Sequence, residues 1–200
     1  MRALIAARYK FAYGAHPYGG VQTWGKTVGD ELERRGFSVE FYEQGDPEPK
    51  GEFLLGIMAN ACDTMGAVLG RCDHVLGVSH GIIEPEKPIP GTPYVFTSEE
   101  IRDYWGSRER ITGPVIRQPI DLDFWRPFDE VTPRKHFVRF SYRHGLPEAR
   151  QAAEALEMPF FHFHRGDPSA VRDCLRKAGV VLATGRAALE AMACGTPAIG

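Results

Sequence analysis

The strand–helix–strand pattern at the N-terminal end constrains this chain more than any other feature of its sequence. Residues 4–7 are a short apolar run, and residues 37–42 alternate between apolar and polar side chains. Between them, four apolar residues are spaced three or four apart: Val21, Trp24, Val28 and Leu32. This spacing places them on one face of a helix, which Gly36 would end. Two strands joined by such a helix predict a parallel sheet.

The same alternation continues along the chain. In the first part we expect strands at 53–58, 74–79 and 94–97 and helices at 63–69 and 100–105, the last with Ser98 as its N-cap. The proline-rich stretch 113–133 has no helical period and indicates a crossing between domains. Beyond it, strands are expected at 136–142, 160–164, 180–183 and 197–199, and helices at 147–156, 168–177 and 186–193.

We therefore predict an α/β protein with two Rossmann-like, doubly wound parallel-sheet domains that face a cleft. The first domain is expected to span residues 1–117, the linker residues 118–133, and the second domain residues 134–200. Since doubly wound domains usually hold ~100–150 residues, we expect the second domain to be incomplete.

The composition is typical of a globular protein, with 43% hydrophobic and 25% charged residues. No apolar run approaches the roughly 18–20 residues that cross a bilayer, so we predict no transmembrane segment, and the N-terminus lacks the features of a signal peptide. The four cysteines form no C-x-x-C pair, which argues against structural zinc. We expect reduced thiols and a cytoplasmic location.

The distribution of charge bears on the class of ligand. The net charge is −2, with an acidic excess in the first 125 residues and a basic excess in the remainder. There is no Lys/Arg run of the kind that binds nucleic acid. A mildly basic second part instead suits a small anionic ligand.

Arginines follow three successive strands expected in the second domain. They are Arg143, Arg165 and Arg186, the last beside Gly185. Ligands of open parallel sheets bind beyond the carboxyl ends of the strands, where helix N-termini and arginines can hold a diphosphate. The alternative is that these are ordinary arginines of exposed loops.

Three further features lie at expected strand ends or helix starts. Gly19 and Gly20 directly precede the first helix, and the absence of a Cβ would let a phosphate or sugar approach the backbone there. His80 follows the strand 74–79, and Glu190 lies in an otherwise apolar helix. A carboxylate in that position could accept from ribose hydroxyls. Each feature also has a simpler explanation. The two glycines could form an ordinary turn, His80 could be a surface histidine, and Glu190 could face solvent on its helix.

Three segments, taken in order, resemble family 4 (group 1) glycosyltransferases, which have the GT-B fold. GGVQTWGKTVGDELERRGFSVEFYE resembles their opening segment, PVIRQPIDLDFWRP their interdomain segment, and GRAALEAMACGTPAIG their donor-site helix. The last of these is the most specific. The resemblance implies an enzyme that moves a sugar from a nucleotide diphosphate sugar to an acceptor, with retention at the anomeric carbon, no metal and no cofactor.

The resemblance also implies roles for individual residues. Glu190 would hold the nucleotide ribose, and His80 would contact the donor sugar near the reacting centre as the catalytic residue. Gly19, Gly20, Arg143, Gly185 and Arg186 would line the donor site. Arg150 is the nearest basic substitute for a lysine that the family carries where this chain has Glu148.

The chain also departs from the family, which keeps a second hypothesis open. Leu182 stands where the family has an earlier glutamate, and Gln118-Pro119 replace an expected Asn-Gly. A non-catalytic nucleotide or sugar binder, or a scaffold that a partner completes, would tolerate these changes. An exposed sheet edge would then favour pairing with another chain, including a second copy. A sugar-nucleotide epimerase is a third reading, but His80 and Glu190 would lack their expected acidic partners.

Aromatic residues near the first helix bear on the acceptor. They are Tyr13, His16, Tyr18 and Trp24. Aromatic faces suit a sugar ring better than a heavily phosphorylated group. We therefore expect a neutral carbohydrate or small-molecule acceptor, contacted by Tyr18 and Trp24. The equal alternative is that these aromatics pack their loop onto the sheet.

Overall fold

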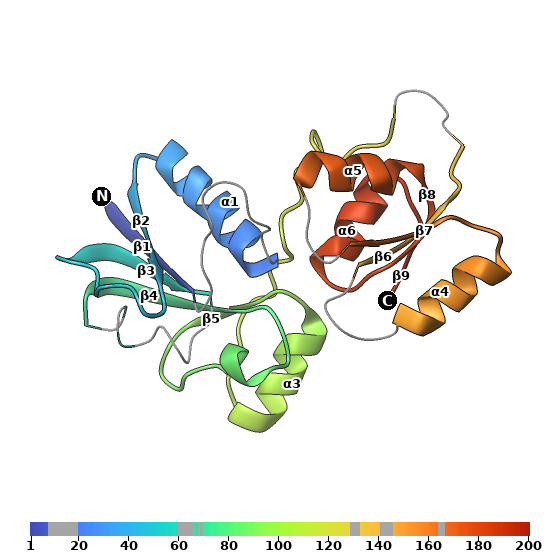
Figure 1. The fold of residues 1–200 in the computed structure, drawn as a ribbon. Helices are drawn as coiled ribbons and strands as arrows, with labels where there is room; N and C mark the ends of the chain where they lie inside the picture. The colour runs from blue at the N-terminus through green and yellow to red at the C-terminus, as the bar shows by residue number, and fades with distance from the viewer. Residues whose placement is uncertain are drawn as a thin grey trace. The chain divides into compact units, whose positions relative to one another are not determined.

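The computed structural model describes residues 1–7, 20–59, 66, 68, 70–128, 133–140, 146–163 and 167–200. The chain divides into two compact units. Among the described residues, the first holds residues 1–7 and those from 21 to 119, and the second holds Gly20 and those from 120 to 200. Each unit is built on its own parallel sheet, and each is coloured continuously along the chain in Figure 1. Among the described residues, no helix is both long and apolar enough to span a membrane.

The first unit contains a five-stranded sheet in the order β2-β1-β3-β4-β5. Its elements are β1 (Arg2–Ala7), α1 (Gly20–Arg34), β2 (Ser38–Glu43), β3 (Phe53–Met58), β4 (Cys72–Ser79), η1 (Glu84–Glu86), β5 (Tyr94–Phe96) and α3 (Glu99–Glu109). Every pair of neighbouring strands is parallel. The expected helix at 63–69 lies largely outside the described residues.

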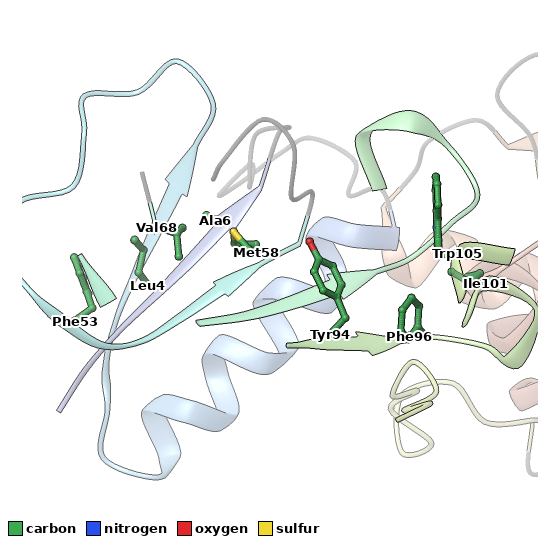
Figure 2. Close-up of a cluster of buried hydrophobic side chains, with 9 residues drawn as sticks. All are labelled: Leu4, Ala6, Phe53, Met58, Val68, Tyr94, Phe96, Ile101 and Trp105. Carbon is green, nitrogen blue, oxygen red and sulfur yellow. The ribbon is translucent and has the colours of Figure 1, made fainter. Parts of the chain in front are cut away.

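Alternate residues of β1 point to opposite faces of this sheet, and a helix covers each face (Figure 1). Ile5 and Ala7 pack with Trp24 of α1. Leu4 and Ala6 lie in the other cluster, which Ile101 and Trp105 of α3 complete. Figure 2 shows that second cluster spread along the sheet. Helices on both faces explain why the β1 run is apolar throughout instead of alternating.

Local signals set the helix ends as the sequence predicts. Gly36 has φ 88° just after α1, a conformation that costs glycine little. Ser98 caps α3 by accepting from the Ile101 N–H at 3.3 Å. The structure adds the short η1 turn to the proline-rich loop, with a proline near its start.

The second unit contains a four-stranded parallel sheet in the order β7-β6-β8-β9. Its elements are β6 (His136–Phe140), α4 (Leu146–Ala155), β7 (Phe160–Phe163), α5 (Pro168–Lys177), β8 (Ala178–Leu182), α6 (Arg186–Ala193) and β9 (Ala198–Ile199). Phe137 packs with α4, whereas Val138 packs with α5 and α6, so helices again cover both faces.

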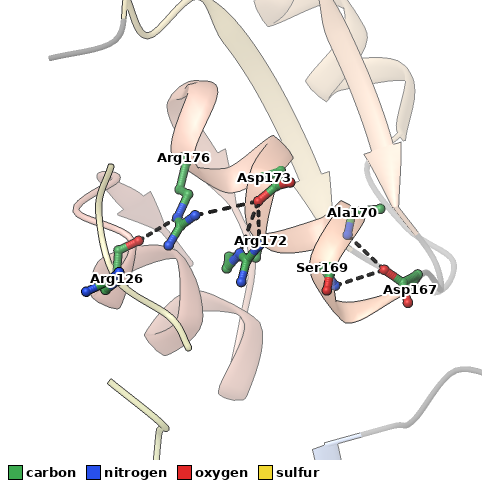
Figure 3. A network of polar contacts seen from close by, with 7 residues as sticks. All are labelled: Arg126, Asp167, Ser169, Ala170, Arg172, Asp173 and Arg176. Atoms are coloured by element: carbon green, nitrogen blue, oxygen red, sulfur yellow. Dashed lines mark hydrogen bonds and ion pairs between the residues drawn. The ribbon is translucent and has the colours of Figure 1, made fainter. Parts of the chain in front are cut away.

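The segment that leads into the second unit is held against α5. Trp125 is buried in the same cluster as Val138. Arg176 donates from Nε to the Arg126 carbonyl at 2.6 Å, and its Nη1 lies 3.6 Å from Asp173 (Figure 3). At the other end of α5, Asp167 accepts from the Ser169 and Ala170 N–H groups, both at 3.0 Å. The backbone donors at the start of α5 are therefore used by its own cap.

Candidate functional residues in the two units

His80 lies directly after β4, at the carboxyl edge of the first parallel sheet. Its backbone N–H donates to Glu86 Oε2 at 3.0 Å. Ser79 Oγ donates to the Glu86 carbonyl at 3.1 Å, and the Trp105 indole N–H donates to the Gly81 carbonyl at 3.1 Å. Ser79 and Gly81, on either side of His80, are thus both held by hydrogen bonds, so the imidazole projects from a constrained backbone.

The imidazole itself has two neighbours. The Trp24 ring meets it edge-on, with 4.9 Å between ring centroids and 72° between planes. Gln118 Nε2 lies 3.4 Å from His80 Nδ1. His80 Nε2 is buried and has no hydrogen-bond partner among the described residues. Burial lowers the pKa of His80 to about 4, so the ring is neutral near pH 7.

Glu86, like Gln118, is a neighbour of His80 that the sequence does not reveal. It is 3% exposed, although glutamate is rarely so buried unless it is paired. Nothing in the run GIIEPEKPIP distinguishes it from the exposed Glu84 two residues earlier. Its role comes from the η1 turn, which directs the carboxylate back to the end of β4.

In the second unit, Arg186 and Glu190 form an ion pair on α6. Arg186 Nε lies 2.8 Å from Glu190 Oε1, and the side chains are only 8% and 13% exposed. Burial raises the pKa of Glu190, and the Arg186 charge opposes that shift. Glu190 is therefore paired and largely buried, and it does not face solvent as the simpler explanation assumed.

The start of α6 differs from that of α5. Its N-cap is Gly185, with φ 60° and no side-chain cap. The helix N-terminus therefore keeps backbone donors that no capping side chain uses, and Arg186 adds a positive charge beside them. This arrangement can hold an anionic group.

The remaining predicted residues are placed as follows. Gly20 is the first residue of α1. Arg150 lies exposed on α4, with its guanidinium 5.1 Å from the Phe160 ring centroid. Trp24 is 8% exposed and packs in the core beside His80. Gly19, Tyr18, Arg143 and Arg165 lie outside the described residues, as do Tyr13 and His16. The described residues bring His80 together with Trp24, and Arg186 together with Glu190.

Two solved glycosyltransferase structures are similar to this chain over nearly its whole length. AviGT4, a glycosyltransferase involved in avilamycin A biosynthesis, matches with a TM-score of 0.66 at 16% identity, over 100% of this chain and 78% of that one. Sucrose-phosphate synthase from Thermosynechococcus elongatus matches with a TM-score of 0.69 at 12% identity, over 99% of this chain and 80% of that one.

These likenesses define the class of fold. The chain has the α/β architecture of GT-B glycosyltransferases, with two parallel Rossmann-like sheets, which confirms the predicted fold class. No protein-family model matches the sequence. A search of curated proteins also finds no match.

Proposed function

We propose that this chain is a glycosyltransferase that moves a sugar from a nucleotide diphosphate sugar to an acceptor. The observation that carries the proposal is His80, a neutral and anchored imidazole whose Nε2 lacks a partner among the described residues. It follows a strand of a parallel sheet, where ligands of such folds bind. The likeness of the fold to two glycosyltransferases supports the same reading.

The donor half of the reaction would use the second unit. Glu190 would accept hydrogen bonds from the ribose hydroxyls, with Arg186 holding the carboxylate in place. The uncapped start of α6 at Gly185, together with Arg143 and Arg150, would stabilise the negative charge that develops on the leaving diphosphate. Gly19 and Gly20 would let the donor approach the backbone. These groups would supply the charge stabilisation for which other enzymes use a metal, so we propose a retaining reaction without an obligatory metal.

On the acceptor side we propose a neutral carbohydrate or small molecule. Tyr18 and Trp24 remain the proposed contacts. Trp24 also packs against the imidazole of His80, with 4.9 Å between the ring centroids. A substitution of Trp24 would therefore alter the histidine as well as any acceptor contact.

We further propose a cytoplasmic enzyme with reduced cysteines. Cys72, Cys174 and Cys194 are free thiols in the structure. Burial is the main cause that raises the pKa of each of them, so the thiols stay protonated and unreactive near pH 7.

A titration with nucleotides tests the proposal. The full chain would be titrated by calorimetry and thermal shift with uridine, adenosine, guanosine and thymidine diphosphates and with their sugar conjugates. We expect one nucleotide to raise Tm and to bind at millimolar concentration or below, because a ligand that binds only the native state stabilises it. Absence of stabilisation by all of them would contradict the proposal.

A pair of carboxylate variants localises the nucleotide. Glu190→Gln should weaken nucleotide binding about tenfold or more, since charge-assisted hydrogen bonds are worth about 1.5–3 kcal/mol. Glu154→Gln, at an exposed position on α4, should leave binding unchanged. Equal affinities for the two variants would remove Glu190 from the nucleotide site.

Leu182 favours a second candidate, a nucleotide-sugar binder without turnover. It lies at the end of β8, where the resembled family has a glutamate, and an apolar side chain cannot take that role. Transfer of a labelled sugar to an acceptor panel separates the two candidates. Binding without transfer or donor hydrolysis would support the binder.

A further inference from the structure

Gln118 reaches His80 from a segment that is itself fixed. The Phe96 N–H donates to the Pro114 carbonyl at 3.0 Å, and the Ile116 N–H donates to the Phe96 carbonyl at 2.9 Å. This pairing attaches residues 114–116 to β5, two residues before Gln118. Pro119 follows directly and restricts the backbone of Gln118 to extended conformations. The side chain of Gln118 is therefore delivered to His80 by a constrained backbone.

The contact between the two side chains decides where the imidazole proton lies. Gln118 approaches with its amide nitrogen, 3.4 Å from His80 Nδ1. An amide N–H group can only donate, so a hydrogen bond in this orientation requires Nδ1 to accept and to carry no proton. In the neutral ring the proton then lies on Nε2. His80 thus presents a donor at Nε2.

The atoms left over are consistent with this assignment. His80 Nε2 and Gln118 Oε1 are both buried and lack hydrogen-bond partners among the described residues. One is a donor and the other an acceptor, and a ligand hydroxyl can both accept and donate. Buried polar atoms without partners are uncommon and costly in native proteins, so this pair needs a hydrogen-bonding partner, such as a water molecule or a ligand hydroxyl.

We propose that Gln118 is the positioning residue of His80, and that its amide holds the imidazole in the Nε2–H tautomer so that His80 donates a hydrogen bond to a hydroxyl of the bound sugar. The tautomer stands on the contacts above, and only the identity of the ligand rests on the proposed function. Among the described residues, Glu86 places a carboxyl group beside this loop, where its Oε2 accepts from the backbone N–H of His80 at 3.0 Å.

Nitrogen NMR of the intact, ¹⁵N-labelled chain tests the tautomer without any ligand. Long-range ¹H–¹⁵N spectra at pH 7 separate protonated from bare ring nitrogens, and the His80 signals are identified by their loss in His80→Gln. We expect a protonated Nε2 and a bare Nδ1. A protonated Nδ1 in the wild-type chain would overturn the proposal.

Variants at position 118 extend the test. Gln118→Glu replaces the donor by a carboxylate, so His80 should take up a proton at Nδ1 and titrate at a higher pH than in the wild-type chain. Gln118→Leu should give a mixture of tautomers. Gln44→Glu, at an exposed glutamine, is the matched control and should change neither property. An unchanged His80 spectrum in folded Gln118→Glu would overturn the proposal. If that variant does not fold, the wild-type spectrum alone tests which ring nitrogen carries the proton.

Turnover gives a readout that separates this inference from the proposed function. With a transferred sugar in hand, Gln118→Glu should lower kcat at least tenfold and leave the affinity for the nucleoside diphosphate within twofold. If no nucleotide binds but the Nε2–H tautomer is observed, the proposed function fails and the positioning role of Gln118 stands. An unchanged kcat would remove the catalytic consequence of that role.

Discussion

At the scale of single residues, burial has given His80 a property that its sequence position does not show. A loop histidine would ordinarily titrate near pH 6.5, whereas burial lowers the pKa of this one to about 4. Trp24 and Gln118 contact the ring, and Glu86 accepts from the backbone N–H of His80. The outcome is an imidazole that stays neutral through the physiological range.

This depressed pKa predicts how stability depends on pH. The unfolded chain protonates His80 below about pH 6.5, while the folded chain resists protonation down to about pH 4. Unfolding therefore takes up a proton in that window, and the free energy of unfolding falls as the pH is lowered, by up to about 3 kcal/mol from this residue alone.

The measurement compares urea unfolding at pH 7 and pH 4 for three chains. His80→Gln should lose less stability on acidification than the wild-type chain does. His74→Gln, at an exposed position on β4, should behave like the wild-type chain. An identical pH dependence for His80→Gln and the wild-type chain would mean that folding does not lower the pKa of His80.

At the scale of elements, the close packing of β4 against β5 sets the edge from which His80 projects. The Tyr94 ring lies over Gly77, and a Cβ added at Gly77 would be 2.3 Å from Tyr94 Cζ. Tyr94 also accepts from the Ile89 N–H at 3.1 Å, so the ring cannot move without losing that bond. Tyr94 appears beside Phe96 in Figure 2. The glycine is therefore a packing requirement of this strand pair.

Gly77→Ala should lower the free energy of unfolding by about 1–3 kcal/mol, the usual cost of overpacking a core. Gly106→Ala is the contrasting variant, because its Cβ would meet only an ordinary contact, 3.6 Å from the Ile111 carbonyl oxygen. Inside α3 that change should stabilise the chain by about 0.4–1 kcal/mol. Chemical denaturation measures the free energy of unfolding of both variants. An unchanged value for Gly77→Ala would show that the Tyr94 ring moves to make room for the added methyl group.

At the scale of the whole molecule, β9 is an outer strand of the second sheet among the described residues. Ile199 on this strand is 54% exposed, and Met192 on α6, an element that contacts β9, is 60% exposed. An edge strand with exposed apolar side chains favours pairing with another chain. We therefore keep the prediction of a homo-oligomer formed through this edge.

Light scattering across a concentration series measures this association. We expect the apparent mass to rise with concentration for the wild-type chain and to stay lower for Ile199→Lys, because a charge on an edge strand opposes pairing. Leu156→Lys, at another exposed apolar position, should associate like the wild-type chain. A wild-type chain that remains monomeric throughout would contradict the prediction.

The sequence by itself determined the elements of this protein and their parallel arrangement, whereas the tertiary structure decided what surrounds His80. The apolar spacing of α1, Ser98 as a cap and the apolar run of β1 are local, since helix and strand periodicities act over a few neighbouring residues. His80 could be expected at a strand end for the same reason. Its neighbours could not, because Gln118 lies 38 residues farther along the chain and Glu86 becomes buried only when its turn folds back on β4. Burial and pairing of this kind depend on contacts that form only when the whole chain is folded, and they determine the protonation state of the His80 imidazole.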